Sequence, residues 1–237
     1  MNNGHLSIKT ILAQGKHRPW PLPARAWSFY QEWNKVVFMH WKLPPEVLIP
    51  FVPTGLEIDM FEGDAWVSVV VFDMNNIRPK NLPPLAVVSD FHEVNVRTYV
   101  KKDGKAGVYF LSIEGSKAIS CFLARTISGL PYRPALMHRR GNSFQLESQA
   151  QKNLIDIDYD TGHEVCEKTL LDIWLTERYA LFQDVGNEIK SFDIHHVEWP
   201  IENIKIEKLV LTYPHFPFIN NAPDLVHYSP GVAVLAW

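Results

Sequence analysis

The residues best suited to chemistry lie together on one segment, residues 93–100. Glu93, Asn95, Arg97 and Tyr99 occupy alternate positions, which on a β-strand places their side chains on one face. A carboxyl group can act as a general acid or base, and a guanidinium can hold a carboxylate through two parallel hydrogen bonds. The pattern is therefore typical of a site that binds a small organic acid and moves a proton. A solvent-exposed strand face has the same pattern, and this alternative stays open.

A second strand is expected to pair with this segment. Asp103 and Gly104 separate it from a β-rich run that ends near residue 115, and Asp-Gly between two such runs favours a hairpin. With a two-residue loop, the carboxyl groups of Glu93 and Glu114 lie opposite each other and repel unless one is protonated. We therefore expect these two groups to titrate as a coupled pair. The same register places Arg97 opposite Phe110 and Asn95 opposite Ser112, and a different loop length would shift it.

A helix is predicted directly after the hairpin. Ser116 is suited to cap its start and Gly129 to end it, with apolar residues at helical spacing between them. This helix would cross back over the hairpin and bring Tyr132 to the polar face. The predicted catalytic residues are Glu93, Glu114 and Tyr132, and the predicted ligand-binding residues are Asn95, Arg97, Tyr99, Phe110, Ser112, Arg125 and Arg133. The alternative for the arginines is that they only neutralise nearby carboxylates.

Strands are expected to dominate the rest of the chain. No linker or internal repeat is visible, so we predict one strand-dominated α+β domain that spans residues 1–237. The first expected elements are a strand over 35–42, a short helix at 44–48 and a strand pair over 56–60 and 65–74. Later strand-like runs cover 144–149, 171–182, 195–199 and 204–211.

The composition excludes several classes of protein. The 237 residues carry 23 Lys+Arg against 26 Asp+Glu, and this near balance creates no field for nucleic acid. The first residues lack the pattern of a signal peptide, and no apolar run approaches the ~18 residues of a membrane helix. Two cysteines are too few for a disulfide framework, and we expect both thiols to be buried and inert. We therefore expect a cytoplasmic protein that binds neither membrane nor nucleic acid, and a homo-oligomer is left open.

No cofactor and no metal site are predicted. The sequence contains no phosphate-binding loop, nucleophile elbow or dinucleotide fingerprint. On a strand, His196 and Glu198 would share one face while His195 points away, and two ligands are fewer than a zinc site requires. The preferred interpretation is that these histidines are structural and hydrogen-bonded.

Eight strings spread over the chain carry a resemblance to a known family. They are FMHW at 38–41, GDAW at 63–66, EVNVRTYV at 93–100, GVYFLS at 107–112, LPY at 130–132, LTERY at 175–179, HVEWP at 196–200 and HYSPG at 227–231. Together they resemble the YqjF-like bacterial family of unknown function, over nearly the whole chain. That family belongs to the acetoacetate decarboxylase-like superfamily. The resemblance therefore implies a double-sheet β-cone, with a few covering helices, around a small-molecule pocket.

The resemblance also implies that one reaction is absent. Acetoacetate decarboxylase forms a Schiff base through the first lysine of a Gly-Tyr-Pro-Lys-Lys string, and the matching string here is GLPYR at 129–133. Tyr132 stands in place of that lysine, and a phenol cannot form an imine. Arg133 cannot act as an amine nucleophile either. Glu93 retains the carboxylate of the decarboxylase's Tyr-x-Glu string, whereas the position of its active-site arginine corresponds to Asn34. Schiff-base decarboxylation is disfavoured.

Two functions from different classes remain. One is a lyase or isomerase that acts on a small oxo-acid, with a glutamate as general acid or base and arginines as the carboxylate clamp. The other is a non-catalytic protein that binds a small, anionic ligand on the same scaffold, because a fold does not fix a function. A purely structural or interaction role is the third and least favoured alternative.

Overall fold

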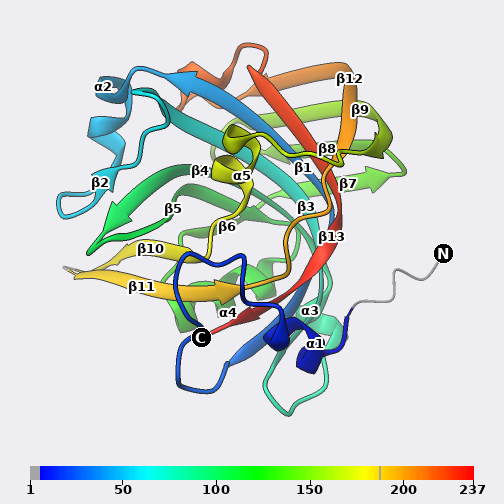
Figure 1. Cartoon of the computed structure of the whole chain (residues 1–237). Coiled ribbons are helices and arrows are strands. Elements are labelled where there is room, and N and C mark those ends of the chain that lie inside the picture. Colours follow the sequence, from blue (N-terminus) through cyan, green and yellow to red (C-terminus); the bar gives the residue numbers. More distant parts are fainter. Residues whose placement is uncertain (1–5, 187) are drawn as a thin grey trace.

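A closed ring of strands forms the centre of the computed structural model, which describes residues 6–186 and 188–237 (Figure 1). The pairing of the last strand with the first closes the ring, and neighbouring strands are antiparallel except for one short parallel contact between β5 and β10. In ring order the strands are β1 (Phe29–Leu43), β3 (Ala65–Pro79), β4 (Phe91–Lys102), β5 (Lys105–Gly115), β10 (Ala180–Val185), β11 (Glu188–His195) and β13 (Leu225–Ala236).

A second layer of strands extends from β13 and covers part of the outer surface of the ring. It consists of β12 (Glu202–Thr212), β9 (Asn153–Glu164), β8 (Ser143–Ser148) and β7 (Leu136–Arg140). Apolar side chains of this layer pack against outward-facing residues of the ring, as Phe144 and Ile157 do against Val69 and Val96. We call this packed region between the two layers the outer core. The strand-dominated, double-sheet architecture expected from the sequence is confirmed.

The interior of the ring holds a separate apolar cluster. Side chains alternate along a strand, so Val37 and Met39 of β1 face the outer core while Val36 and Phe38 face inward. The inward residues of β1, β3 and β13 meet Tyr132 and Trp199. We call this region the ring interior. Strands such as β1 and β3 therefore contribute side chains both to the outer core and to the ring interior, which explains why parts of them are apolar almost continuously.

Short helices and turns precede or connect the strands. They are α1 (Ile8–Ala13), α2 (Pro45–Leu48), α3 (Ala86–Ser89), α4 (Ala118–Ser128), α5 (Leu170–Thr176) and the 3₁₀ turns η1 (Ile49–Phe51) and η2 (Pro217–Ile219). Two further short strands, β2 (Glu57–Ile58) and β6 (Tyr132–Pro134), pair with β4 and β5. Of the helices in the described residues, none combines the length and the apolarity needed to cross a membrane.

Two of the predicted strands and one predicted strand pairing are wrong. Residues 171–182 form α5 and then β10, because Thr169 and Asp172 make a reciprocal capping box that starts a helix. Residues 196–199 lie beyond the end of β11 at His195. The short strand β2 pairs with β4 rather than with the strand that follows it.

The predicted end of helix α4 is confirmed, whereas its predicted start is wrong. Gly129 ends it in the left-handed conformation (φ 76°), as expected. The helix begins at Ala118 rather than at a Ser116 cap, and the Ser116 hydroxyl instead accepts a hydrogen bond from the backbone of His92. Only Ser120 and Cys121 of α4 are buried. The apolar residues Phe122 and Ile127 are more than half exposed.

Candidate functional site

The polar face predicted on residues 93–100 lies in the ring interior. Glu93, Asn95 and Arg97 of β4 expose 3%, 3% and 8% of their surface, and Tyr99 exposes none. The alternative of a solvent-exposed strand face is therefore wrong. These four polar groups were removed from water on folding, which is costly unless each one finds a partner.

An extra residue in β5 changes the register that the sequence suggests. From Lys102 to Arg97 the pairing is as predicted, with Arg97 opposite Phe110. The register then shifts by one, so that Val96 lies opposite Ser112 and Leu111 is the additional residue of a β-bulge. Because the side-chain period of a strand is two, a shift of one residue moves every later side chain of β5 to the other face.

The predicted pairing of Glu93 with Glu114 is consequently wrong. Glu93 lies opposite Gly115, and Glu114 faces the outer core together with Ser112. There Asn153 donates a hydrogen bond to Glu114 at 2.7 Å, and Tyr213 donates one at 3.5 Å. The predicted opposition of Asn95 and Ser112 fails for the same reason. Glu114 and Ser112 therefore do not join the group around Glu93.

Glu93 instead forms a hydrogen-bonded pair with Tyr132. The Tyr132 hydroxyl donates to Glu93 Oε2 at 2.7 Å, and Asn95 Nδ2 donates to Glu93 Oε1 at 3.3 Å. Parallel pairing of β6 with β5 holds Tyr132 in place beside Ile113. Burial raises the pKa of Glu93 to about 7, although the two hydrogen bonds oppose this shift. A carboxyl group with such a pKa can give or accept a proton near neutral pH.

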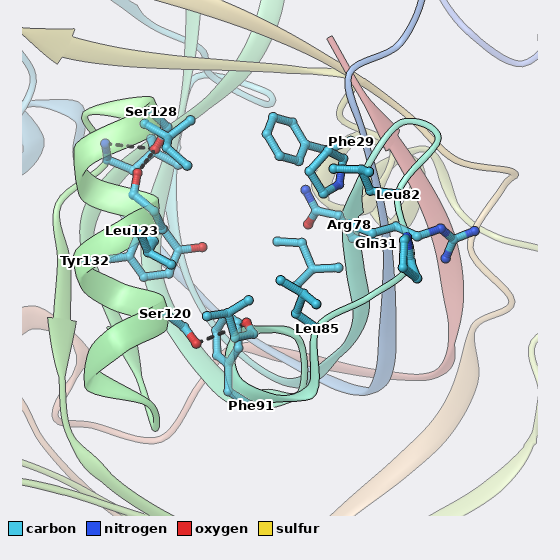
Figure 2. A pocket seen from close by; sticks show the side chains of 17 residues that line it. Phe29, Gln31, Arg78, Leu82, Leu85, Phe91, Ser120, Leu123, Ser128 and Tyr132 are labelled. Atoms are coloured by element: carbon cyan, nitrogen blue, oxygen red, sulfur yellow. Dashed lines mark hydrogen bonds between the residues drawn. The ribbon is translucent and has the colours of Figure 1, made fainter.

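A largely apolar cavity of about 440 Å³ lies against Tyr132, at the end of the ring that α4 covers. Figure 2 shows α4, with Ser120, Leu123 and Ser128, on one side and Phe29, Gln31, Arg78 and Leu82 on the other. Tyr132 lines the α4 side of this cavity (Figure 2). The cavity thus reaches one member of the Tyr132–Glu93 pair, and its remaining wall offers few polar groups.

Arg97 lies farther along β4 and is not part of this cavity wall. Its guanidinium lies 5.5 Å from the ring centroid of Phe38. The buried atoms Nε and Nη2 of Arg97 have no hydrogen-bond partner, and neither has Oδ1 of Asn95. Phe110, directly opposite Arg97, contributes a partly buried ring to the same interior.

The other two predicted arginines lie outside the ring interior. Arg125 is exposed on α4. Arg133 is exposed and donates a hydrogen bond to Gln151, and its charge acts on Glu114 rather than on Glu93. Only Arg97 among the three predicted arginines therefore lies with the Glu93 group.

Tyr99 joins a group of polar residues that the sequence analysis did not identify. Its hydroxyl lies 2.6 Å from Ser68 Oγ, and Ser68 Oγ lies 2.6 Å from His40 Nδ1. His40 in turn contacts His227 from the far end of the chain. The histidines of the strings FMHW and HYSPG were a signal for this group, because each directly follows apolar residues of its strand and is buried.

The histidines that were considered for metal binding, His195 and His196, each form a hydrogen bond with a backbone carbonyl. His195 Nε2 lies 2.8 Å from the Ile11 carbonyl and His196 Nδ1 2.7 Å from the Val197 carbonyl. Within residues 6–186 and 188–237, no group of three or more His, Cys, Asp or Glu side chains could hold a metal ion. Cys121 is buried, with its pKa raised to about 11 by burial and by Glu93. Cys166 is exposed, which corrects the expectation that both thiols are buried.

Solved structures similar to this one share its fold at low sequence identity. An acetoacetate decarboxylase from Legionella pneumophila aligns with a TM-score of 0.56 and 13% identity, over 96% of this chain and 92% of the other. An acetoacetate decarboxylase-like enzyme from Sphingomonas wittichii gives 0.56 and 13%, over 89% and 92%. The enduracididine biosynthesis enzyme MppR, complexed with pyruvate, gives 0.52 and 12%, over 92% and 90%. The fold is therefore acetoacetate decarboxylase-like.

Sequence comparison identifies the family itself. Residues 30–233 match the family model DUF2071, described as an uncharacterized conserved protein. The uncharacterized protein YqjF of Bacillus subtilis is 34% identical over 225 residues, which cover 91% of this chain and 93% of YqjF. The chain therefore belongs to the DUF2071 family, is a relative of YqjF and has an acetoacetate decarboxylase-like fold.

Proposed function

We propose that this protein binds a small carboxylate or oxo-acid in the ring interior and acts on it as a lyase or isomerase. Glu93 is the general acid or base, Tyr132 the proton donor or anchor, and Arg97 the group that holds the carboxylate. Tyr99, Asn95 and Phe110 complete the surroundings of the ligand. Glu114, Ser112, Arg125 and Arg133 are left out of this site, because they lie in the outer core or are exposed.

The unpartnered guanidinium of Arg97 is the observation that carries the proposal. A buried cation without a hydrogen-bond acceptor is costly, and protein interiors rarely retain such groups. Nε and Nη2 of Arg97 are in this state, and the guanidinium lies 5.5 Å from the ring centroid of Phe38. A carboxylate would accept two parallel hydrogen bonds from these atoms and compensate the charge. The structural neighbour that is described as complexed with pyruvate gives an example of such a ligand on this fold.

Glu93 supports catalysis in addition to binding. Its pKa of about 7 lies where general acid–base groups work best at neutral pH. The hydrogen bond from Tyr132 fixes the carboxyl group, and the cavity beside Tyr132 offers space for a ligand. These features suit proton transfer at carbon next to a carbonyl group.

The proposal excludes a Schiff base as the route. Tyr132 cannot form an imine, and no lysine is buried in the part of the chain that the structure describes. We expect that incubation with acetoacetate and borohydride, followed by mass spectrometry of the intact protein, leaves no adduct in the ring interior. An adduct that maps to an interior position would contradict this expectation.

A non-catalytic binding protein is the second candidate. It is favoured by the wall of the cavity, which is lined mainly by apolar residues such as Leu85, Phe91 and Leu123. Under this alternative the Tyr132–Glu93 pair orients a ligand and transfers no proton. The two candidates predict the same binding and differ only in turnover.

A thermal-shift screen with small carboxylic and oxo-acids, pyruvate included, tests the proposal. We expect at least one acid to raise the melting temperature of the wild type, and Arg97→Lys to weaken its binding at least tenfold while changing the ligand-free melting temperature little. Glu114→Gln is the matched control, because it alters a buried carboxyl group outside the site. Product analysis of each hit then separates enzyme from binding protein, with Glu93→Gln expected to abolish turnover. The proposal fails if no acid binds or if Arg97→Lys binds as tightly as the wild type.

The proposal includes a reducing, cytoplasmic location. Both cysteines are free, and Cys166 is exposed without a disulfide partner within the described residues. A fusion to a thiol-sensitive reporter, expressed in the source cell, would test the location.

A further inference from the structure

A continuous hydrogen-bonded series starts on α5, passes through the ring interior and returns to α5. Asp172 Oδ1 lies 2.9 Å from His227 Nε2, and His227 Nδ1 lies 3.0 Å from His40 Nε2. His40 Nδ1 lies 2.6 Å from Ser68 Oγ, which lies 2.6 Å from the Tyr99 hydroxyl. Tyr99 reaches the Leu175 carbonyl at 3.0 Å. We call this series the histidine relay; in order it contains Asp172, His227, His40, Ser68, Tyr99 and the Leu175 carbonyl.

The relay has one contact more than it has protons that can form hydrogen bonds along it. An ionised carboxylate at one end and a carbonyl at the other can only accept hydrogen bonds. Each of the four groups between them, two imidazoles and two hydroxyls, brings one donatable proton when neutral. Five contacts of 3.0 Å or less therefore share four protons, and one of these contacts must lack a hydrogen bond. A sixth contact, between the Tyr99 hydroxyl and His40 Nδ1, is longer, at 3.5 Å. A fifth proton would complete all five.

The absence of a hydrogen bond costs least at one particular contact of the relay. Both contacts of Ser68 are only 2.6 Å long, a distance at which two facing lone pairs repel strongly. A bare imidazole nitrogen facing the Asp172 carboxylate would also be repelled. The two remaining contacts, between His227 and His40 and between Tyr99 and the Leu175 carbonyl, are both 3.0 Å long. Two bare imidazole nitrogens have lone pairs fixed in the ring planes, whereas a hydroxyl can turn its proton to another acceptor, so the gap is placed between Tyr99 and Leu175. With four protons, each donor therefore points toward Asp172, and His40 carries its proton on Nε2.

A fifth proton reverses part of this order. When His227 carries protons on both nitrogens, it donates to Asp172 and to His40 Nε2. His40 then stays neutral but must carry its own proton on Nδ1, from which it donates to Ser68. Ser68 donates to Tyr99, and Tyr99 donates to Leu175. The uptake of one proton at His227 is thus transmitted to two hydroxyl groups in the ring interior.

We propose that the histidine relay is a second acid–base centre, which takes up one proton to leave His227 doubly protonated and delivers one proton from Ser68 to the ring interior. The side chain of Asp172, next to His227, is 15% exposed. Ser68, in the middle of the relay, lies directly opposite Arg97 in the β3–β4 pair. Delivery to a base bound at Arg97 rests on the proposed function, whereas proton uptake by the relay does not.

The transfer of this proton balances. The Ser68 hydroxyl gives its proton to the bound base, His40 Nδ1 gives its proton to Ser68, and His227 Nδ1 gives its proton to His40 Nε2. His227 is left neutral with a proton on Nε2, which is the state with four protons. No other reactant is needed.

The charges around the relay favour His227 over His40 as the group that gains the proton. The pKa of His40 lies well below its usual value because of burial, His227 and the Arg97 charge. Burial also lowers the pKa of His227, but the Asp172 carboxylate opposes that shift. Asp172 is held ionised, since hydrogen bonds from Thr169 and His227 lower its pKa against the effect of burial.

One further charged group, Arg178, contacts the relay at Tyr99. Arg178 lies 4.9 Å from the ring centroid of Tyr99, and its charge is compensated by Asp59 at 2.6 Å. Lys101 also contacts Asp59, at 2.7 Å. Arg97, directly opposite Ser68, has no such carboxylate partner among the residues that the structure describes, and its charge opposes a positive charge on His40.

Nitrogen NMR of the full-length protein with labelled histidine tests the relay without any ligand. Between pH 8 and pH 5, we expect His227 to change from a single proton on Nε2 to two protons. At the same midpoint, His40 should stay neutral and move its proton from Nε2 to Nδ1. The proposal is overturned if His40 keeps one tautomer while His227 titrates, or if neither histidine changes in this range.

Variants separate the relay from ordinary histidine titration. Asp172→Asn should lower the His227 midpoint by about one pH unit or more, because the counter-charge is lost. Ser68→Ala should leave His227 titrating while His40 no longer changes tautomer. Asp224→Asn is the matched control, since Asp224 bonds the backbone of Lys42 next to His40 but lies outside the relay. An equal midpoint change in Asp224→Asn would contradict the proposal, and a failed ligand screen would leave these results unaffected.

Discussion

Glu93 and Glu114 form two nearly matching groups on opposite sides of the same hairpin. Each is a buried carboxyl group that accepts hydrogen bonds from one tyrosine and one asparagine, Tyr132 and Asn95 in the first case and Asn153 with Tyr213 in the second. Burial raises the pKa of each to about 7. The chemistry of the two groups is therefore almost the same.

Their surroundings differ. The Glu93 group borders a cavity through Tyr132 and shares the ring interior with the unpartnered Arg97. Glu114 lies in the apolar outer core between the two layers. A perturbed carboxyl group is thus a weak indicator of a site by itself. Space for a ligand and an uncompensated charge are what distinguish the first group from the second.

The largest expected difference is in stability after truncation. Glu114→Ala should cost about 2–4 kcal/mol of unfolding free energy, because Asn153 and Tyr213 lose their acceptor within the packed outer core. Glu93→Ala should cost less, since the neighbouring cavity lets water reach the groups left behind. Urea unfolding at pH 6 measures both variants. Equal losses of unfolding free energy would contradict the inference that the surroundings of Glu93 are more open than those of Glu114.

The pH dependence of stability is the next effect. A carboxyl group with a raised pKa in the folded state holds its proton after the unfolded chain has released it, so stability is lost as pH rises from about 4.5 through 7. Glu93→Gln and Glu114→Gln should each match the wild type near pH 4 and exceed its stability at pH 8 by about 1–3 kcal/mol. Chemical unfolding across this range measures the change. If either variant is less stable than the wild type at pH 8, ionisation of the corresponding glutamate does not destabilise the folded protein, and the prediction is wrong for that residue.

The smallest effect concerns the tyrosines. Tyr132→Phe removes a 2.7 Å hydrogen bond that lowers the pKa of Glu93, so this pKa should rise by about 0.5–1 unit. Tyr213→Phe removes a contact of 3.5 Å and should change the pKa of Glu114 less. Carboxyl-resolved carbon NMR titration of both variants compares them. A larger shift in Tyr213→Phe would reverse the ranking of the two hydrogen bonds.

Local sequence signals predicted the parts of the fold that depend on neighbours along the chain. The Asp103-Gly104 turn fixed the register as far as Arg97 and Phe110, and Gly129 marked the end of α4. The alternation of residues 93–99 correctly grouped four polar side chains on one face. Each of these features depends on geometry within a few residues.

Features that depend on distant contacts were not predictable in this way. The bulge at Leu111 has no composition signal, and it alone separates Glu114 from Glu93. Asn153 and Tyr213 reach Glu114 across the outer core, and His227 meets His40 across 187 positions. Only closure of the ring and packing of the second layer bring such residues together.

The loose attachment of α4 has a consequence for the size of ligand that the protein accepts. This helix forms one wall of the cavity, yet it buries only Ser120 and Cys121, and several of its apolar side chains remain exposed. Elements with few buried apolar contacts open at a lower free energy than the core strands beside them. The wall formed by α4 is therefore the part of the site that yields most easily, whereas Glu93 and Arg97 lie on the core strand β4. Affinity for bulkier ligands will be governed by the free energy of moving α4, and amide exchange along this helix measures that quantity directly.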